Sequence, residues 1–455
     1  MSAGFDVSGR HVLVAGAGRS GRACAKVLGE LGAHVRLADE RPGDVDGQPV
    51  LRLERPPPET DLVITSPGWR PDSPLLLAAA AAGLTIWGEV ELAWRLRPDD
   101  QRWLAITGTN GKTTTTGMLA EILGAAGRHA AAVGNIGTPV VEVVRAEPAF
   151  EVLAVELSSF QLHWSSTIVP TASAIVNIAA DHLDWHGSHF AYAAAKARVF
   201  TAANMGLYDA DDNGARAVGQ AHAARGGHAV PVTLQAPAPG MLGVRAGWLV
   251  DEAFGGGDLL AVRELAVRGP HNVTNALLAS GLALADGCPP DAVRRGLAAY
   301  RPGAHRMSHV ARVNGVDFVD DSKGTNPHAT AAALRSYAKI VWIAGGLAKG
   351  ASYQELIAAH ADRLAAAVLI GDCAPQIAEA IGRHADQIPV IMAATLDDAV
   401  GEAARLARPG DTVLLSPAAA SMDMFTDYHQ RGEVFAAAVR ALPGVSDGAL
   451  AQEVT

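Results

Sequence analysis

A short segment near residue 110 combines glycines, a lysine and threonines in an order suited to binding polyphosphate. It has the sequence Gly-Thr-Asn-Gly-Lys-Thr-Thr over residues 108–114, between an apolar run that predicts a strand and a segment that predicts a helix. Such a loop presents backbone N–H groups, the Lys112 ammonium and the Thr113 hydroxyl to phosphate oxygens and a magnesium ion. Ile106 stands where the general P-loop pattern has its first glycine, so we interpret the segment as a shorter variant. A Gly-Lys turn at a helix start is the alternative.

A second glycine motif lies near the N-terminus. Gly16, Gly18 and Gly21 have G-x-G-x-x-G spacing between a predicted strand and a predicted helix, and Asp39 ends the next strand. Taken alone, this pattern predicts an NAD-dependent dehydrogenase. Its physical content is narrower, because glycines let the backbone approach any pyrophosphate and a UDP-sugar carries one too. A tight turn without ligand also stays open, so the motif does not name the nucleotide.

Three further polar features could do chemistry. Residues 181–186 (Asp-His-Leu-Asp-Trp-His) hold several metal-ligand types in a spacing that fits no common zinc motif, so a metal site, an acid–base site and a polar loop all stay open. Glu156 ends a predicted strand, where a lone carboxylate is more often solvated than functional. Lys196 lies in a predicted helix over 190–200, where a lysine is by default a solvated surface charge.

The elements that must position these residues are strands alternating with helices, the rhythm of parallel α/β sheets. A chain of 455 residues is too long for one ordinary core, so its size predicts three domains. A charged, proline-containing stretch at 96–101 and Arg301-Pro302-Gly303 predict linkers. The predicted domains are residues 1–97, 98–302 and 303–455. The predicted strands are 11–15, 34–39, 103–107, 152–157, 172–178, 315–319, 340–344, 366–370 and 412–415.

Composition excludes several classes of protein. Apolar residues make up 49% of the chain and charged residues 18%, which is typical of packed globular domains. The net charge of −10 argues against a broad grip on nucleic acid. Three scattered cysteines, Cys24, Cys288 and Cys373, predict neither a disulfide framework nor a zinc motif. We find no signal sequence and no apolar stretch of the roughly 18 residues that a membrane span needs, so a soluble, cytoplasmic protein is expected.

The motifs taken together resemble those of the Mur ligases, a family of ATP-dependent amide ligases. Residues 108–113 resemble the family's G-T-N-G-K-[ST] loop, residues 156–162 (Glu-Leu-Ser-Ser-Phe-Gln-Leu) its second nucleotide-domain motif, and residues 321–326 (Asp-Ser-Lys-Gly-Thr-Asn) its third-domain motif. The resemblance extends along the whole chain. It implies a Rossmann-like N-terminal domain, a central P-loop-type ATPase domain with a parallel sheet, and a Rossmann-like C-terminal domain.

The resemblance also implies which residues form the site. The expected ATP-binding residues are Gly108, Thr109, Asn110, Gly111, Lys112, Thr113, Thr114, Asn272, Asn275, Arg306 and Asp321. The expected contacts of a UDP-linked substrate are Gly18, Arg19, Ser20, Asp39, Arg41, Gly68, Asn135 and His182. The expected contacts of an incoming amino acid are Thr325, Lys349, Ser421 and Tyr428. The residues expected at the metal ions are Thr113, Glu156, His182 and Lys196, and the expected catalytic residues are Lys112, Glu156, His182, Lys196 and Lys323.

The reaction implied by the resemblance joins D-glutamate to UDP-N-acetylmuramoyl-L-alanine, a step in peptidoglycan precursor synthesis. ATP would phosphorylate the substrate carboxylate to an acyl phosphate, which the D-glutamate amine then attacks, with two magnesium ions and Lys112 offsetting phosphoryl charge. Most members of the family carry a lysine at the place of Lys196 that reacts with carbon dioxide. The resulting carbamate would be an oxygen ligand for the second ion.

Some positions depart from the pattern of the D-glutamate-adding members. Gly324 replaces the usual Ala, Ala419 a Cys, Met422 a Leu and Tyr428 a Phe, which leaves the shape of the amino-acid pocket open. The change at Gly324 is expected to matter little. A Mur-type ligase for another amino acid, an NAD-dependent oxidoreductase and a non-catalytic nucleotide-binding scaffold are the alternatives. A monomer that acts on small molecules is expected.

Overall fold

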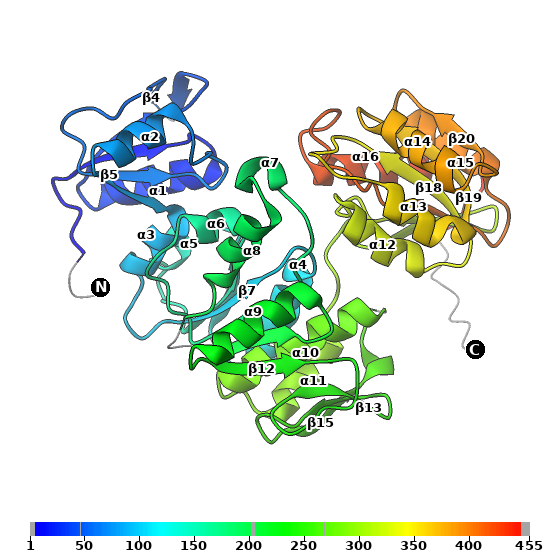
Figure 1. Ribbon diagram of the computed structural model, residues 1–455, viewed down its shortest axis with the longest axis horizontal. Coiled ribbons are helices and arrows are strands. Elements are labelled where there is room, and N and C mark those ends of the chain that lie inside the picture. The colour runs from blue at the N-terminus through cyan, green and yellow to red at the C-terminus, as the bar shows by residue number, and fades with distance from the viewer. Residues whose placement is uncertain (1–4, 46, 202–204, 268, 447–455) are drawn as a thin grey trace. The chain divides into compact units, whose positions relative to one another are not determined.

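The computed structural model describes residues 5–45, 47–201, 205–267 and 269–446, in two compact units (Figure 1). One unit comprises Met1–Ile178 and Gly187–Tyr300, and the other comprises Ala179–His186 and Arg301–Thr455. The first unit holds two sheets and the second holds one, each built with helices. The predicted α/β class is therefore confirmed. No helix in the described ranges is both long and apolar enough to cross a membrane.

The N-terminal sheet is parallel except at one edge. Its order is β3-β4-β2-β1-β5-β6, and only β3 runs antiparallel to its neighbour. The central strand β1 has β2 on one side and β5 on the other, so the turn after β1 lies at the switch point where such sheets bind ligands. The strands are β1 (His11–Ala15), β2 (His34–Ala38), β3 (Gly43–Val45), β4 (Gln48–Leu51), β5 (Leu62–Thr65) and β6 (Thr85–Gly88), and the helices are α1 (Arg19–Glu30), α2 (Pro74–Ala81) and α3 (Glu89–Leu96).

The central sheet has nine strands in the order β15-β14-β13-β12-β11-β10-β7-β9-β8. The strands from β8 to β12 are parallel, so the residues that follow β7, β8, β9 and β10 meet at one edge. Its strands are β7 (Arg102–Thr107), β8 (Ala130–Gly134), β9 (Val152–Glu156), β10 (Ala172–Ile175), β11 (Met205–Asp209), β12 (His228–Val232), β13 (Leu242–Arg245), β14 (Trp248–Asp251) and β15 (Gly257–Ala261). Its helices are α4 (Lys112–Ala125), α5 (Val140–Val143), α6 (Ser159–His163), α8 (His189–Ala197), α9 (Asn213–Ala224), η1 (Val262–Glu264), α10 (Pro270–Ala285) and α11 (Pro290–Ala299).

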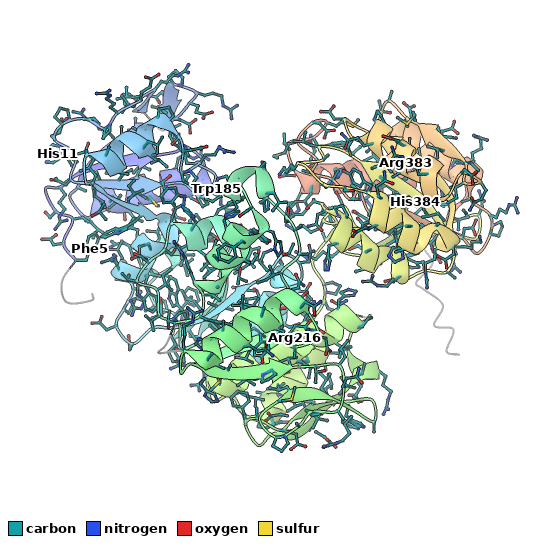
Figure 2. The ribbon with its side chains drawn as sticks, in the orientation of Figure 1. Phe5, His11, Trp185, Arg216, Arg383 and His384 are labelled. Carbon is teal, nitrogen blue, oxygen red and sulfur yellow. The ribbon has the colours of Figure 1, made fainter. Side chains whose placement is uncertain are left out.

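The third sheet has the order β20-β19-β18-β21-β17-β16-β22, with antiparallel pairing only at β16. Ile340, Trp342 and Ala344 of β18 face the core under α12, α13 and α14, whereas Val341 and Ile343 face that under α15 and α16. Figure 2 shows Arg383 and His384 at the end of α14. Its strands are β16 (Ser308–Val313), β17 (Val316–Asp320), β18 (Ile340–Gly345), β19 (Leu364–Ile370), β20 (Val390–Met392), β21 (Thr412–Leu415) and β22 (Val445–Ser446). The helices of this unit are α7 (Leu183–His186), α12 (Pro327–Arg335), α13 (Gln354–His360), η2 (Ala361–Arg363), α14 (Ala374–His384), α15 (Leu396–Leu406) and α16 (Tyr428–Arg440).

One apolar cluster joins the first two sheets, and we call it the shared core. It includes Val14 of β1, Val90 of α3, Val141 of α5, Trp103 of β7 and Leu153 of β9, all buried. Helices α4, α10 and α11 cover the other face of the central sheet through a second cluster. The N-terminal and central sheets therefore form a single packed body.

Two buried glutamates of α3 tie that helix to the central sheet. Glu89 Oε1 accepts the backbone N–H of Val141 at 2.8 Å. Glu91 accepts the N–H groups of Ser166 at 2.8 Å and Thr167 at 3.0 Å. The pKa values of the two carboxyl groups shift in opposite directions. Burial raises the pKa of Glu89 to about 7. Burial also acts to raise the pKa of Glu91, but the hydrogen bonds, chiefly from Thr167, outweigh it and lower that pKa.

We expect Glu89→Gln to raise the free energy of unfolding at pH 8 by up to about 3 kcal/mol, since a pKa near 7 lies roughly 2.5 units above that of an unfolded chain. Between about pH 4.5 and 7, Glu89 takes up a proton when the chain folds. The cost of the carboxylate to stability therefore grows over this range and is complete above about pH 7. The gain should therefore vanish near pH 4.5. Denaturant unfolding at both pH values measures it.

Glu91→Gln is the matched comparison on the same helix. Its lowered pKa means that the carboxylate stabilises the fold above its unfolded pKa, and that this contribution is lost as the pH falls through the folded pKa. The variant should be less stable than the parent at pH 8. Equal changes in the free energy of unfolding at pH 8 for the two substitutions would contradict the opposite pKa shifts of Glu89 and Glu91.

Candidate active site

The predicted phosphate loop lies between β7 and α4, at the edge of the central sheet where the residues that follow β7, β8, β9 and β10 meet. Gly111 caps α4 with a left-handed backbone, φ 81°. A Cβ atom at this position would lie 2.5 Å from Asn275 Oδ1 and 2.9 Å from Val176 Cγ1, so only glycine fits. The first N–H groups of α4 have no partner within their own helix, and they favour an anion at this end. The loop therefore has the backbone shape that polyphosphate binding requires.

Two predicted lysines meet at one carbonyl oxygen of this loop. Lys112 Nζ donates to Gly108 O at 2.9 Å, and Lys196 Nζ donates to the same oxygen at 2.6 Å. Lys196 is 1% exposed and lies over the Tyr192 ring, with Nζ 4.6 Å from the centroid. The default interpretation of Lys196 as a solvated surface charge is therefore wrong. The side chain instead lies beneath the phosphate loop.

Glu156, at the end of β9, is a buried carboxylate with one oxygen paired and one not. Its Oε1 accepts Asn135 Nδ2 at 2.9 Å, while the buried Oε2 has no hydrogen-bond partner. Gly134 lets the neighbouring loop approach, because a Cβ there would lie 2.1 Å from Glu156 O. A buried carboxylate oxygen without a partner is costly unless a cation or donor binds it. Glu156 thus fits magnesium, which prefers oxygen ligands.

The protein supplies few metal ligands of its own. Within the described ranges, no group of three or more His, Cys, Asp and Glu side chains could hold a metal ion. A magnesium site here would depend on Glu156, the Thr113 hydroxyl, phosphate oxygens and water. That ligand set is ordinary for magnesium bound with a nucleotide.

The amide side chains predicted at the start of α10 do lie beside the loop. Asn275 is buried, its Oδ1 accepts Thr115 Oγ1 at 3.3 Å, and its Nδ2 donates to Asn272 Oδ1 at 3.2 Å. A residue that the sequence patterns missed, Asn177, also contacts the loop. Asn177 accepts the Asn110 N–H on Oδ1 at 2.8 Å and donates through Nδ2 to Asn110 O at 3.2 Å.

The first glycine motif forms a tight turn whose glycines serve packing. A Cβ at Gly21 would lie 1.7 Å from Gly16 O, and one at Gly16 would lie 2.3 Å from Ser66 Oγ. Asp39 holds the turn itself, because its carboxylate accepts the N–H groups of Ala17 at 2.8 Å and Arg41 at 3.2 Å. The other predicted contacts of the UDP-linked substrate in this sheet are exposed or half-buried: Gly18, Arg19, Ser20, Arg41 and Gly68.

The predicted residues of the second unit follow the carboxyl ends of β17, β18 and β21. Buried Asp321 accepts Ser416 Oγ on Oδ2 at 2.8 Å. Burial raises the pKa of Asp321 to about 7, and the hydrogen bond from Ser416 and the charge of Arg306 act in the opposite direction. His305, beside Arg306, has its Nδ1 2.6 Å from Asp320 Oδ2. The adjacent acids are therefore each fixed by a different partner.

Gly324 lies against a hydrogen-bonded pair of side chains. A Cβ at this position would lie 2.6 Å from Asp321 Oδ2 and 2.7 Å from Ser416 Oγ, the two atoms that share a hydrogen bond. An alanine would force that pair to move. The expectation that glycine in place of the usual alanine matters little stays a prediction, whereas the reverse change to alanine in this chain would disturb the pair.

A buried arginine of α16, which the sequence patterns also missed, joins two loops of the second unit. Arg431 is 0% exposed and donates to Ser322 Oγ at 3.0 Å, to Ser322 O at 2.8 Å and to Ala419 O at 3.2 Å. Lys323 lies over the Tyr428 ring, with Nζ 3.6 Å from the centroid. Arg431 thereby fixes the backbone beneath Lys323, and Tyr428 supports the lysine side chain.

Of the other predicted residues of this unit, Thr325, Lys349 and Ser421 lie in loops that follow strands of the third sheet, whereas His182 directly precedes α7. Leu347 and Ala420 form a β-bridge between the loops that carry Lys349 and buried Ser421. Lys349 has a left-handed backbone, φ 49°. His182, also left-handed, lies beside Asp181, with its Nε2 3.7 Å from Asp181 Oδ2. Thr325 follows Gly324 in the loop before α12.

Comparisons with known proteins agree with this geometry. The Mur ligase middle domain matches residues 106–283, and the Mur ligase glutamate ligase domain matches residues 305–419. A UDP-N-acetylmuramoylalanine--D-glutamate ligase of Thermobifida fusca (strain YX) is 50% identical over 465 residues, which cover 97% of this chain and 100% of the relative. The chain belongs to the Mur ligase family. A ligase of the same name from Frankia casuarinae is 52% identical over 460 residues, or 98% and 97% of the two chains.

Solved structures share the fold. UDP-N-acetylmuramate-alanine ligase MurC from Thermotoga maritima is similar with a TM-score of 0.60 at 18% identity, over 95% of this chain and 99% of that one. Folylpolyglutamate synthase of Mycobacterium tuberculosis, in complex with ADP and AMPPCP, has a TM-score of 0.57 at 18% identity, over 74% and 91%. Membership of a ligase family disfavours the oxidoreductase alternative.

Proposed function

We propose that this chain is a UDP-N-acetylmuramoyl-L-alanine:D-glutamate ligase that cleaves ATP to ADP and acts in peptidoglycan precursor synthesis. The observation that carries the proposal is the edge of the central sheet, where Lys112 lies on the phosphate loop and a buried Glu156 oxygen lacks a partner. Relatives that are half identical over nearly the whole chain bear that enzyme's name. We place the domain boundaries at residues 1–97, 98–302 and 303–455.

The nucleotide would bind with its phosphates on the loop at 108–114. There the N–H groups at the start of α4 and the Lys112 ammonium contact phosphate oxygens. Asn272 and Asn275 at the start of α10 would also contact the nucleotide, and Arg306 and Asp321 are further proposed nucleotide contacts. Glu156 and Thr113 would hold a magnesium ion that neutralises charge on the phosphates, and His182 would lie near a second ion.

The chain's own groups have three tasks in the reaction. Asn135, fixed by Glu156, would orient the substrate so that its carboxylate attacks the γ-phosphate of ATP and forms an acyl phosphate with release of ADP. Lys112 and Lys323 would offset the charge on the phosphoryl oxygens during transfer. The amine of D-glutamate then attacks the acyl carbon, phosphate leaves, and an amide bond forms.

We further propose that Lys196 acts as a carbamate. Two ammonium groups that share one carbonyl oxygen repel each other, whereas a carbamate on Lys196 would attract Lys112 and supply an oxygen ligand. A carbon-13 NMR carbamate signal, present with labelled bicarbonate and absent from Lys196→Met enzyme, tests this. An active, metal-loaded enzyme without that signal would rule it out.

D-glutamate would bind at the carboxyl ends of β17, β18 and β21 in the third sheet. Lys349 and Ser421 would contact its carboxylates, while Thr325 and Tyr428 line the same loops. The first glycine turn, with Gly18, Arg19, Ser20, Asp39, Arg41 and Gly68, would hold the UDP portion. We also propose a cytoplasmic monomer.

One assay tests the assignment as a whole. The enzyme is incubated with ATP, magnesium, UDP-N-acetylmuramoyl-L-alanine and each candidate amino acid, and the products are weighed. We expect a D-glutamate amide together with one phosphate released per product. An adduct with another amino acid alone would indicate a different Mur-type ligase. A change in nicotinamide absorbance without phosphate release would favour the oxidoreductase alternative.

A further inference from the structure

Asn177 holds the phosphate loop at Asn110, whereas the two lysines meet at Gly108 O. Strand β10 lies beside β7, with Ile175 paired to Thr107, so the residues after β10 run next to the loop after β7. Val176 donates its N–H to Thr107 O at 2.9 Å, and from there the chain leaves the strand. The strand predicted over 172–178 thus ends at Ile175, and its last residues support the loop instead.

Three hydrogen bonds join Asn177 to two loop residues. The Asn177 side-chain amide accepts the Asn110 N–H and donates to Asn110 O, so both of its ends are engaged on one residue. Its backbone carbonyl accepts the Thr109 N–H at 2.9 Å. The first two bonds depend on the side chain, whereas the third does not. Substitution of Asn177 therefore removes two of the three contacts and leaves the strand register intact.

Asn177 is itself held rigidly. Ile178 donates its N–H to Asp212 Oδ1 at 3.1 Å, and the same oxygen accepts the Ala215 N–H at the start of α9. A Cβ at Gly108 would lie 3.0 Å from Val176 Cβ, so the loop backbone rests directly on this segment. A polar side chain whose neighbouring residues are fixed in this way can transmit that rigidity to the loop it contacts.

We propose that Asn177 is a positioning residue for the ATP phosphates, because its side-chain amide holds Thr109–Asn110 in the shape that receives them. The proposal rests on the ATP-dependent function proposed above. Asn177 need not touch the nucleotide. It acts by fixing the loop before the nucleotide arrives, which reduces the ordering that binding requires.

Direct binding measurements without the other substrates test the proposal. Loss of two hydrogen bonds should raise the Kd of Asn177→Ala for magnesium–ATP about ten-fold. Binding of adenosine should change by less than about two-fold, because adenosine lacks the phosphates that the loop contacts. In steady-state turnover, the KM for ATP should rise together with the Kd for magnesium–ATP, while the KM for D-glutamate stays the same.

Two further variants distinguish positioning from folding. Asn177→Asp keeps the acceptor for the Asn110 N–H, loses the donor and adds a negative charge beside the phosphates, so its Kd for ATP should exceed that of Asn177→Ala. Asn213→Ala, at the exposed start of α9, is the control and should match the parent. Thermal unfolding of each variant reports whether the fold is kept.

The outcomes separate this proposal from the function on which it rests. Failure of the parent enzyme to bind ATP would overturn the proposed function. Parent-like ATP binding by both Asn177 variants would overturn the positioning role alone. Equal weakening of ATP and adenosine binding, together with a lowered unfolding temperature, would also overturn it, because that pattern indicates a purely structural residue.

Discussion

Replacement of Lys112 by methionine should lower kcat/KM for ATP by about a thousand-fold while the protein stays folded. The unbranched side chain keeps most of its length but loses the ammonium group that donates to Gly108 O at 2.9 Å and to Thr109 O at 2.9 Å. That group is also the positive charge that the loop at 108–114 itself carries. Substrate-dependent phosphate release under steady-state conditions measures the loss.

Lys26→Met is the matched control, because Lys26 is an exposed lysine on α1 and should be replaced without effect. Lys112→Arg keeps the positive charge but replaces the compact ammonium group by a planar guanidinium group, so we expect it to retain only part of the activity. Full activity in Lys112→Met enzyme would favour the scaffold alternative, in which the chain binds nucleotide without catalysing its cleavage.

Glu156→Gln should also reduce kcat by about a thousand-fold and should raise the magnesium concentration needed for half-maximal activity. Glutamine can still accept Asn135 Nδ2, so the contact between the two loops is kept. An NH₂ group then stands at the place of Oε2, the oxygen that has no partner in this structure, and an NH₂ group does not bind a cation. A magnesium titration of phosphate release separates this effect from a loss of folding.

Glu151→Gln provides the comparison, because Glu151 is exposed and directly precedes the first residue of the same strand. It should leave both kcat and the magnesium dependence unchanged. An unaltered magnesium dependence in Glu156→Gln enzyme would remove Glu156 from the proposed metal ligands, even if activity fell.

The sequence predicted the features that depend on local order. The loop at 108–114 and Glu156 each follow an apolar strand, and such strand ends are visible along a single stretch of chain. Every predicted strand is found, although that at 172–178 ends at Ile175 and that at 315–319 is shifted by one residue to Val316–Asp320. Short and polar strands such as β3 and β13 were not predicted, because they carry little apolar periodicity.

Residues whose role depends on sheet order could not be predicted in this way. Asn177 supports the phosphate loop because β10 lies beside β7, which brings it to Asn110 across 67 residues, a contact that no local pattern records. Arg431 contacts Ser322 across 109 residues for the same kind of reason. Burial of Lys196 likewise follows from the packing of α8, since a lysine on a helix is exposed by default.

The shared core has a practical consequence for dividing the protein. A fragment that ends near residue 97 would carry α3 with Val90, Leu92 and Ala93 stripped of their cover from α5 and the central sheet. Such a surface promotes association of fragments rather than independent folding. The end of the first unit at Tyr300 avoids that cut, so expression of residues 1–300 keeps both sheets and their common interior in one polypeptide.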